Sequence, residues 1–271
     1  EHTDGDDFTE TNGETLLGFE LNFELGDNGN LKGVYLISQD DDFGNFIDEG
    51  EDRMHTFGAQ IDFSFDDIEV WGAFGQTNFF DGDDTELDED NTAMFIGASY
   101  NGGNWGLGGS YGVIDPYYGA EGAWGRVGPW FNPTNIEGYG VNAWFDLNED
   151  TTIYGSYLDL ETHEDGEYGP NSIFEYTDYD EATVLKLGVD FGINDKWSGT
   201  LGYERVDGDF FDELGYEFTW YNLGLKYAVS DQTTVWINYL LNADGYLGDN
   251  LGPADNDISG GILSIQATVK F

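Results

Sequence analysis

The sequence predicts an all-β chain whose antiparallel strands run up and down in chain order. Three observations support this prediction. Apolar and polar residues alternate with a period of two in many segments, most clearly in 261–271, and this period places successive side chains on opposite faces of a strand. No segment shows the 3.6-residue period of an amphipathic helix. The connections between the alternating segments are short and long in turn.

Thirteen strands are expected, each from its own alternating run. Their ranges are about 15–24, 31–38, 53–65, 68–78, 92–101, 104–114, 138–146, 151–162, 182–191, 197–206, 218–229, 233–242 and 260–271. The clearest apolar faces are formed, in order, by Leu17, Phe19, Leu21 and Phe23; Phe57, Ala59, Ile61, Phe63 and Phe65; Tyr139, Val141, Ala143 and Phe145; Leu185, Leu187, Val189 and Phe191; Tyr221, Leu223, Leu225, Tyr227 and Val229; and Leu263, Ile265, Ala267, Val269 and Phe271.

The connections predict the topology. Short, turn-like segments rich in Gly, Asn and Asp, which supply the positive φ angles of tight hairpins, lie at 26–30, 66–67, 102–103, 148–150, 193–196 and 230–232. Long segments lie at 39–52, 79–91, 115–137, 163–181, 207–217 and 243–257, with 1–14 as a seventh. In an up-and-down meander all short turns therefore lie at one end of the sheet and all long loops at the other.

The charge of the chain is strongly negative and unevenly placed. There are 55 Asp and Glu against 8 Lys and Arg, a formal net charge of −47, and 39 of the acids fall in the seven long segments. This balance excludes nucleic-acid binding through a basic face. The aromatic content of 17% argues against disorder, and the absence of cysteine excludes disulfides and thiolate sites.

These features together favour a transmembrane β-barrel of the bacterial outer membrane, which has short turns at one end and long exterior loops at the other. Ten residues at about 3.3 Å each and a tilt of about 45° rise roughly 23 Å, close to the apolar band of such barrels. The alternative is a secreted acidic β-sandwich or β-helix with an interior rich in Val, Ile and Leu. The face opposite the apolar one is instead polar and rich in Gly, which favours a water-filled lumen.

The strand count raises a closure problem. With thirteen strands the first and last run in the same direction, whereas single-chain bacterial barrels have even numbers so that their edges pair antiparallel. The simplest solution is one further strand before Glu1, giving about fourteen strands and making 1–271 an N-terminally incomplete single barrel domain. Closure between parallel edges is the second possibility.

The end of the chain resembles a known pattern. The segment Ile265–Phe271, with alternating apolar residues and a terminal Phe, looks like the C-terminal signature of Gram-negative outer-membrane barrels, and the whole chain resembles porins. The resemblance implies that the barrel-assembly machinery reads Phe271 as an assembly signal. It also implies contact with outer-membrane lipid and lipopolysaccharide, small hydrophilic solutes as partners, and a homotrimer as one assembly. Porins fused to an N-terminal cell-wall-binding module share these features.

Residues on the polar faces are expected to line the pore. They are Glu20, Glu24, Gln60, Asp62, Asn142, Asp146, Lys186, Asp190, Glu204, Lys226 and Lys270, with Asn22, Asn238 and Gln266 on the same faces. Carboxylate-rich walls attract cations and repel anions. A cation preference is therefore expected, which the inward lysines offset locally.

The segment 115–137 has few charges, many aromatic residues and the one basic residue of the long segments. It is a candidate constriction loop through Asp115, Tyr117, Tyr118, Glu121, Trp124, Arg126 and Trp130. Folding inward would place Arg126 opposite acidic wall residues. A loop that caps the barrel rim or lies at a subunit contact is the other interpretation.

Other aromatic residues near strand ends or on outer faces are expected to form interfacial girdles. They are Tyr35, Trp71, Tyr100, Trp105, Tyr154, Trp197, Tyr203, Tyr227 and Tyr239. Trp144 and Trp236 fall on the polar face, where they narrow the pore or form a stacking surface for sugars.

Catalysis and tight metal binding are not expected. The carboxylates Asp81, Asp83 and Asp84 offer oxygen ligands for weak Ca²⁺ or Mg²⁺ binding in an exterior loop, but they lack the EF-hand order. No other cofactor is indicated. His55 falls on the lipid-facing side of its strand, and His163 lies in an acidic segment without a nucleophile beside it in the sequence, so the chain is not expected to be an enzyme.

The sequence therefore predicts an outer-membrane porin: a water-filled, cation-preferring channel for passive diffusion of small hydrophilic solutes. Two alternatives stay open. One is a structural barrel that tethers the envelope through an N-terminal module, and the other is a substrate-specific channel.

Overall fold

The computed structural model describes residues 15–39, 53–80, 90–119, 126–127, 130–131, 133–163, 181–210, 214–230, 232–247 and 260–269. These residues form a single 13-stranded antiparallel sheet and a separate pair of short strands. They include no helix long and apolar enough to cross a membrane. The all-β prediction is confirmed.

The strands follow the expected ranges closely. They are β1 (Thr15–Glu24), β2 (Gly29–Gln39), β3 (Arg53–Phe65), β4 (Ile68–Phe80), β5 (Thr92–Asn101), β6 (Trp105–Ile114), β9 (Ile136–Asn148), β10 (Thr151–Thr162), β11 (Glu181–Asn194), β12 (Trp197–Phe210), β13 (Leu214–Ser230), β14 (Thr233–Leu247) and β15 (Gly260–Val269). The short pair, β7 (Arg126–Val127) and β8 (Trp130–Phe131), lies within the candidate constriction loop and was not expected.

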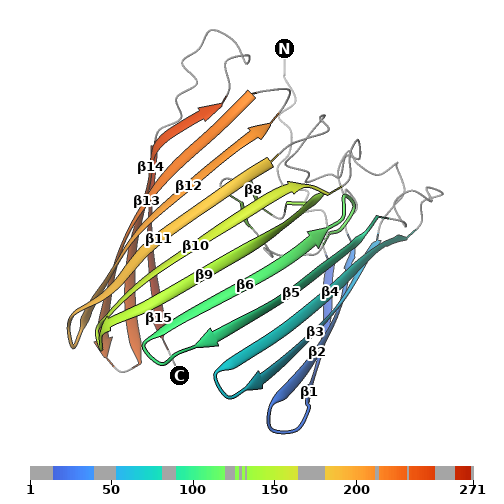
Figure 1. Ribbon diagram of the computed structural model, residues 1–271, viewed down its shortest axis with the longest axis horizontal. Helices are drawn as coiled ribbons and strands as arrows, with labels where there is room; N and C mark the ends of the chain where they lie inside the picture. The colour runs from blue at the N-terminus through green and yellow to red at the C-terminus, as the bar shows by residue number, and fades with distance from the viewer. Residues whose placement is uncertain are drawn as a thin grey trace, which may run out of the picture.

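The sheet is an up-and-down meander. Each strand pairs with its neighbour in the chain, and β6 pairs with β9 across the loop that carries β7 and β8. The short turns all lie at one end of the tilted strands (Figure 1). Asp66, Gly26 and Gly103 adopt positive φ angles in three of them, as tight hairpin turns require.

The sheet curls into a barrel that is open along one seam (Figure 1). β1 and β15 are its two edges, and no ladder joins them in the described part of the chain. With thirteen strands these edges run in the same direction, as the strand count predicts. The additional strand that would close the seam stays a prediction.

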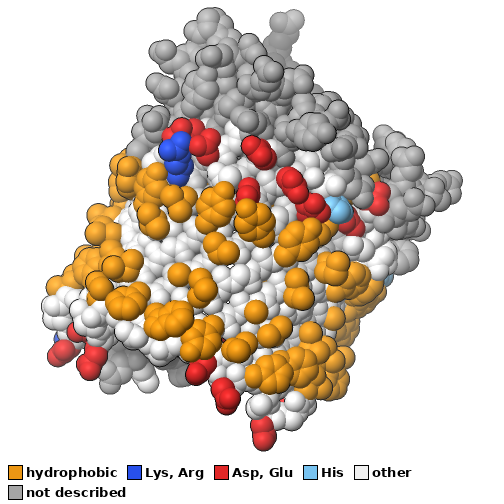
Figure 2. Space-filling view, viewed as in Figure 1, with side chains coloured by type: hydrophobic (Ala, Val, Ile, Leu, Met, Phe, Trp, Pro, Cys, Tyr) orange, Lys and Arg blue, Asp and Glu red, His pale blue; other side chains and the backbone are white. Residues whose placement is uncertain are grey.

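The outer face of the barrel is apolar. Side chains such as Leu21, Met94 and Ile265 are 62%, 57% and 69% exposed, and the visible face carries hydrophobic side chains between two borders of Asp and Glu (Figure 2). Apolar surface this extensive requires an apolar environment, as the outer faces of transmembrane barrels have.

The inner face is not polar along its whole length, and this corrects the expected lumen. Near the long-loop end its residues form a buried apolar cluster of Ala93, Ile114, Ile136, Leu160, Ala182, Val184, Val206 and Phe218. Tyr118, from the segment after β6, packs against this cluster. A polar wall is found only below it, towards the short turns.

The segment 207–217, expected to be a long loop, is largely strand. The ladder of β12 and β13 continues through Asp207↔Glu217 to Phe210↔Leu214. Arg205 stabilises this extension, because its Nη2 lies 2.8 Å from Asp207 Oδ2 and 3.1 Å from Glu217 Oε2. The acids that suggested a solvated loop are therefore partly neutralised within a hairpin.

Two of the expected girdle aromatics, Trp71 and Tyr154, lie on the inner face instead. Trp71 pairs with inward-facing Asp62, and a Cβ added at Gly97 would lie 2.5 Å from its ring. Tyr154 lies in the same way over Gly188 of β11. Each ring lies flat on the wall because the neighbouring strand has a glycine at that place.

Candidate functional site

The inner wall holds the expected pore-lining residues. On β1, Glu20 lies between the exposed Phe19 and Leu21 and therefore faces inward. The strand registers place the following residues on the same face: Glu24, Gln60, Asp62, Asn142, Asp146, Lys186, Asp190, Glu204 and Lys226. Lys270 lies outside the described residues.

Two inward lysines are paired with carboxylates of neighbouring strands. Lys186 Nζ lies 3.5 Å from Glu204 Oε2, directly across the β11–β12 ladder. Lys32 Nζ lies 2.9 Å from Glu20 Oε2, across β1 and β2. The opposite charges of each pair cancel locally.

The candidate constriction loop begins by turning into the barrel. The Gly119 carbonyl accepts hydrogen bonds from the Thr56 hydroxyl, over 3.0 Å, and from the Thr77 hydroxyl. The Gly119 amide donates to Thr77 Oγ1 over 3.1 Å. Both threonines are buried on the inner faces of β3 and β4, so the chain that leaves β6 at residue 114 reaches the wall two and three strands away.

Tyr118 fills the space between this segment and the wall. Its ring lies over Gly75 of β4, where an added Cβ would be 2.6 Å from the phenol oxygen. The same side chain packs against the buried apolar cluster. Burial raises the pKa of the Tyr118 phenol, because the ionised form would lose its hydration.

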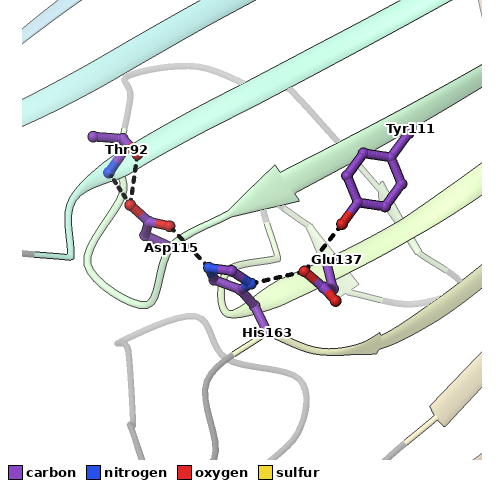
Figure 3. Close-up of polar contacts among 5 residues, drawn as sticks. All are labelled: Thr92, Tyr111, Asp115, Glu137 and His163. Carbon is purple, nitrogen blue, oxygen red and sulfur yellow. Dashed lines mark hydrogen bonds and ion pairs between the residues drawn. The ribbon is translucent and has the colours of Figure 1, made fainter.

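A polar network fixes the start of the loop at the barrel rim (Figure 3). Asp115 Oδ2 accepts hydrogen bonds from the Thr92 amide, over 2.8 Å, and from the Thr92 hydroxyl, over 2.6 Å. Its Oδ1 lies 3.4 Å from His163 Nε2. His163 Nδ1 lies 2.9 Å from Glu137 Oε2, and the Tyr111 hydroxyl donates to the same oxygen over 3.1 Å.

The backbone reinforces this network. The Asn135 amide donates to the Asp115 carbonyl over 3.4 Å, and the Asn135 carbonyl accepts from the His163 amide over 3.3 Å. Asn135 is fully buried with a φ of 55°, a conformation that Asn tolerates better than most residues. The two ends of the loop are therefore held together beside β10.

Among the described residues, His163 links the carboxylates of Asp115 and Glu137. Only the protonated imidazolium donates to both carboxylates at once, since the neutral ring has one N–H. The ring is partly exposed, and its described contacts with Asp115 and Glu137 position the loop. Among the residues with described positions, no group of three or more His, Asp or Glu side chains is placed to hold a metal ion.

The remaining expected site residues are less completely described. Tyr117 donates its amide to the Asp90 carbonyl over 2.8 Å. The backbones of Arg126 and Trp130 belong to the β7–β8 ladder. Glu121, Trp124, Phe271 and the candidate metal ligands Asp81, Asp83 and Asp84 lie outside the described residues.

Sequence reasoning missed several residues of this site. The inward position of Lys32 was readable from the alternation of its strand. Thr56 and Thr77 carry no sequence signal, because their partner is a backbone group 63 or 42 residues away. The carboxylate partners of His163 come from other strand ends, so spacing along the chain does not reveal them.

Comparison with known proteins identifies the fold. No protein-family model and no curated protein matches the chain. Among solved structures, OmpT, an outer membrane protein of Vibrio cholerae, is similar with a TM-score of 0.54 and 14% identity over 94% of this chain and 88% of that chain. A porin refined at 1.8 Å resolution is similar with a TM-score of 0.53 and 14% identity over 94% of this chain and 92% of that chain. The fold is that of an outer-membrane β-barrel.

Proposed function

We propose that this chain is an outer-membrane porin, a water-filled channel through which small hydrophilic solutes diffuse passively across the bacterial outer membrane, with a preference for cations. The observation that carries the proposal is a barrel with an apolar outer face and a carboxylate-rich inner wall below the loop. An apolar outer band around a polar interior is what a channel in a bilayer needs.

The cation preference follows from the charge of the described wall. Glu20 and Glu204 are paired with lysines, whereas Glu24, Asp62, Asp146 and Asp190 face inward without a lysine or arginine partner in the described part of the chain. Lys226 contributes an inward positive charge that opposes these carboxylates. A narrow space walled by net negative charge concentrates cations and depletes anions.

The inward loop sets the width of the channel in this proposal. The segment 115–119 crosses from β6 to the inner wall of β3 and β4, and Tyr118 packs there against the buried apolar cluster of the inner wall. Solutes then pass through the remaining part of the cross-section. This arrangement supports the constriction interpretation over a loop that only caps the rim.

The surroundings are proposed on the same basis. Outer-membrane lipid covers the apolar band, lipopolysaccharide faces the acidic loop end, and the barrel-assembly machinery reads Phe271. A homotrimer is supported by the trimer form of the V. cholerae protein OmpT, which is 12% identical with a TM-score of 0.50 over 94% of this chain and 89% of that chain.

Two further features belong to the proposal. A further strand at the seam between β1 and β15 brings the barrel to fourteen strands. The exterior carboxylates bind Ca²⁺ or Mg²⁺ weakly.

Liposome swelling tests the diffusion function. Purified protein reconstituted into liposomes should admit uncharged sugars and amino acids at rates that fall smoothly with solute size. Swelling with one solute class alone would favour the substrate-specific channel. No swelling by a folded, inserted barrel would favour the structural tether.

A further inference from the structure

A polar groove lies in the inner wall near the short turns, away from the loop and its anchors. It has a volume of about 640 Å³ and extends over β10 to β14. The lining of the groove includes Tyr154, Asp190, Thr200, Asn222, Lys226 and Trp236. A volume of this size is in the range of small-molecule sites.

The floor of the groove contains a buried glycine, Gly224. A Cβ added at Gly224 would lie 3.3 Å from Thr200 Cβ, 3.3 Å from Trp236 Nε1 and 3.5 Å from Asn238 Oδ1. These side chains close over the glycine, and a larger residue there would push them apart. The glycine therefore lets Thr200 and the indole of Trp236 lie close together in the wall.

The ring of Trp236 is an exposed aromatic surface in the groove. The residue is 41% exposed although it lies on the inner face. Lys226, directly opposite it on β13, holds its Nζ 5.9 Å from the ring centroid. Lys32 and Lys186 have carboxylate partners, but within the described residues Lys226 has none. Its ammonium is available as a hydrogen-bond donor.

A carboxylate lies in the same groove as the ring. Asp190 Oδ1 accepts the Thr200 hydroxyl over 2.6 Å, which leaves Asp190 Oδ2 without a partner among the described residues. Asp190 is exposed, so its carboxylate can accept a hydrogen bond from a hydroxyl group of a bound molecule.

We propose that this groove is a binding site for neutral sugars, with one sugar ring stacked on Trp236 and its hydroxyls bonded to Lys226 and Asp190. A sugar has an apolar face of C–H groups and a rim of hydroxyls that both donate and accept, which matches a ring surrounded by both kinds of partner. Lys226 and Asp190 carry opposite charges, so the groove selects neither cations nor anions. The inference rests on the proposed channel and gives it a solute class.

Ion current through single channels in planar bilayers tests the site, with maltose as the probe and a poly(ethylene glycol) of similar size as the comparison solute. Maltose should reduce the wild-type current saturably. W236L keeps apolar bulk but removes the ring, and should weaken the apparent affinity about three- to tenfold. W236F should retain most of it. The matched control is W144A, which changes another inward tryptophan outside the groove.

A second readout does not need conduction. Maltose should change the tryptophan fluorescence of the folded protein in detergent saturably, and W236L should abolish the change. The sugar site is overturned, and the channel stands, if the wild-type current falls linearly and equally with maltose and with the polymer. The same conclusion follows if W236L responds to maltose as the wild type does. Saturable fluorescence without any current steps overturns the channel while the site stands.

Discussion

Gly119 and Thr77 hold each other by reciprocal hydrogen bonds across the inside of the barrel. The Gly119 amide donates to Thr77 Oγ1 over 3.1 Å, and the Thr77 hydroxyl donates to the Gly119 carbonyl. One side chain on β4 therefore satisfies both backbone groups of a residue that follows β6. Together with the Thr56 hydroxyl, this contact holds the start of the loop against the inner wall.

Replacing Thr77 should release the loop. T77V keeps the shape of the side chain but removes the partner of the Gly119 amide and one of the two donors to the Gly119 carbonyl, which keeps the Thr56 hydroxyl. This loss should disfavour the inward position of the loop by about 1–3 kcal/mol. Single-channel recordings should show a higher mean conductance and more frequent current fluctuations. T183V, which removes a threonine on the outer face of β11, is the control and should conduct like wild type. Unchanged conductance in T77V would mean that the loop does not narrow the channel.

The contact between Tyr118 and Gly75 gives a second test of the loop position. G75A places a methyl group 2.6 Å from the Tyr118 phenol oxygen, so the ring must move away from β4. We expect altered conductance and faster proteolysis within 115–137. G33A is the matched control, because nothing lies within 4 Å of its added Cβ. Equal behaviour of the two variants would contradict the packing of Tyr118 on the wall.

The Lys186–Glu204 pair should tune ion selectivity. K186Q exposes the Glu204 carboxylate to the lumen and should shift the reversal potential towards stronger cation selectivity, whereas E204Q should shift it in the opposite direction. K196Q changes a lysine in a short turn and should have little effect. Shifts of the same sign in K186Q and E204Q would exclude an electrostatic cause.

His163 should stabilise the closed base of the loop. H163A removes the contacts to Asp115 and Glu137 and should lower the free energy of unfolding by about 1–2 kcal/mol. Y111F removes a single exposed hydrogen bond to Glu137 and should cost less. Thermal unfolding followed by circular dichroism measures both. A loss in Y111F as large as that in H163A would assign the stability to Glu137 alone.

The strands were predictable because their signal is local. On β1, Leu17 to Glu24 alternate so clearly that one face can only be apolar, and the register of the hairpin follows from its short turn. The same rule was insufficient for Trp71, since β4 carries apolar residues on both faces. Gly97 on the next strand makes room for the indole inside, but β4 and β5 are joined by a long segment, so the sequence does not specify their register.

The loop position and the apolar cluster were not predictable from spacing. Val184 and Val206 look like ordinary strand residues, but they belong to a buried cluster against which Tyr118 packs from a distant part of the chain. The hydrogen bonds of Gly119 join segments 42 and 63 residues apart. Such contacts become visible only when the strands are placed around the curled sheet.

The reversal potential of single channels in a KCl gradient tests the central proposal most directly. Purified, folded protein should insert into planar bilayers, conduct in ohmic steps and give a reversal potential with the sign of cation selectivity. This result would follow from the inward carboxylates that no lysine or arginine neutralises in the described part of the chain. An anion-selective potential, or an inserted and folded barrel that never conducts, would contradict the proposed channel.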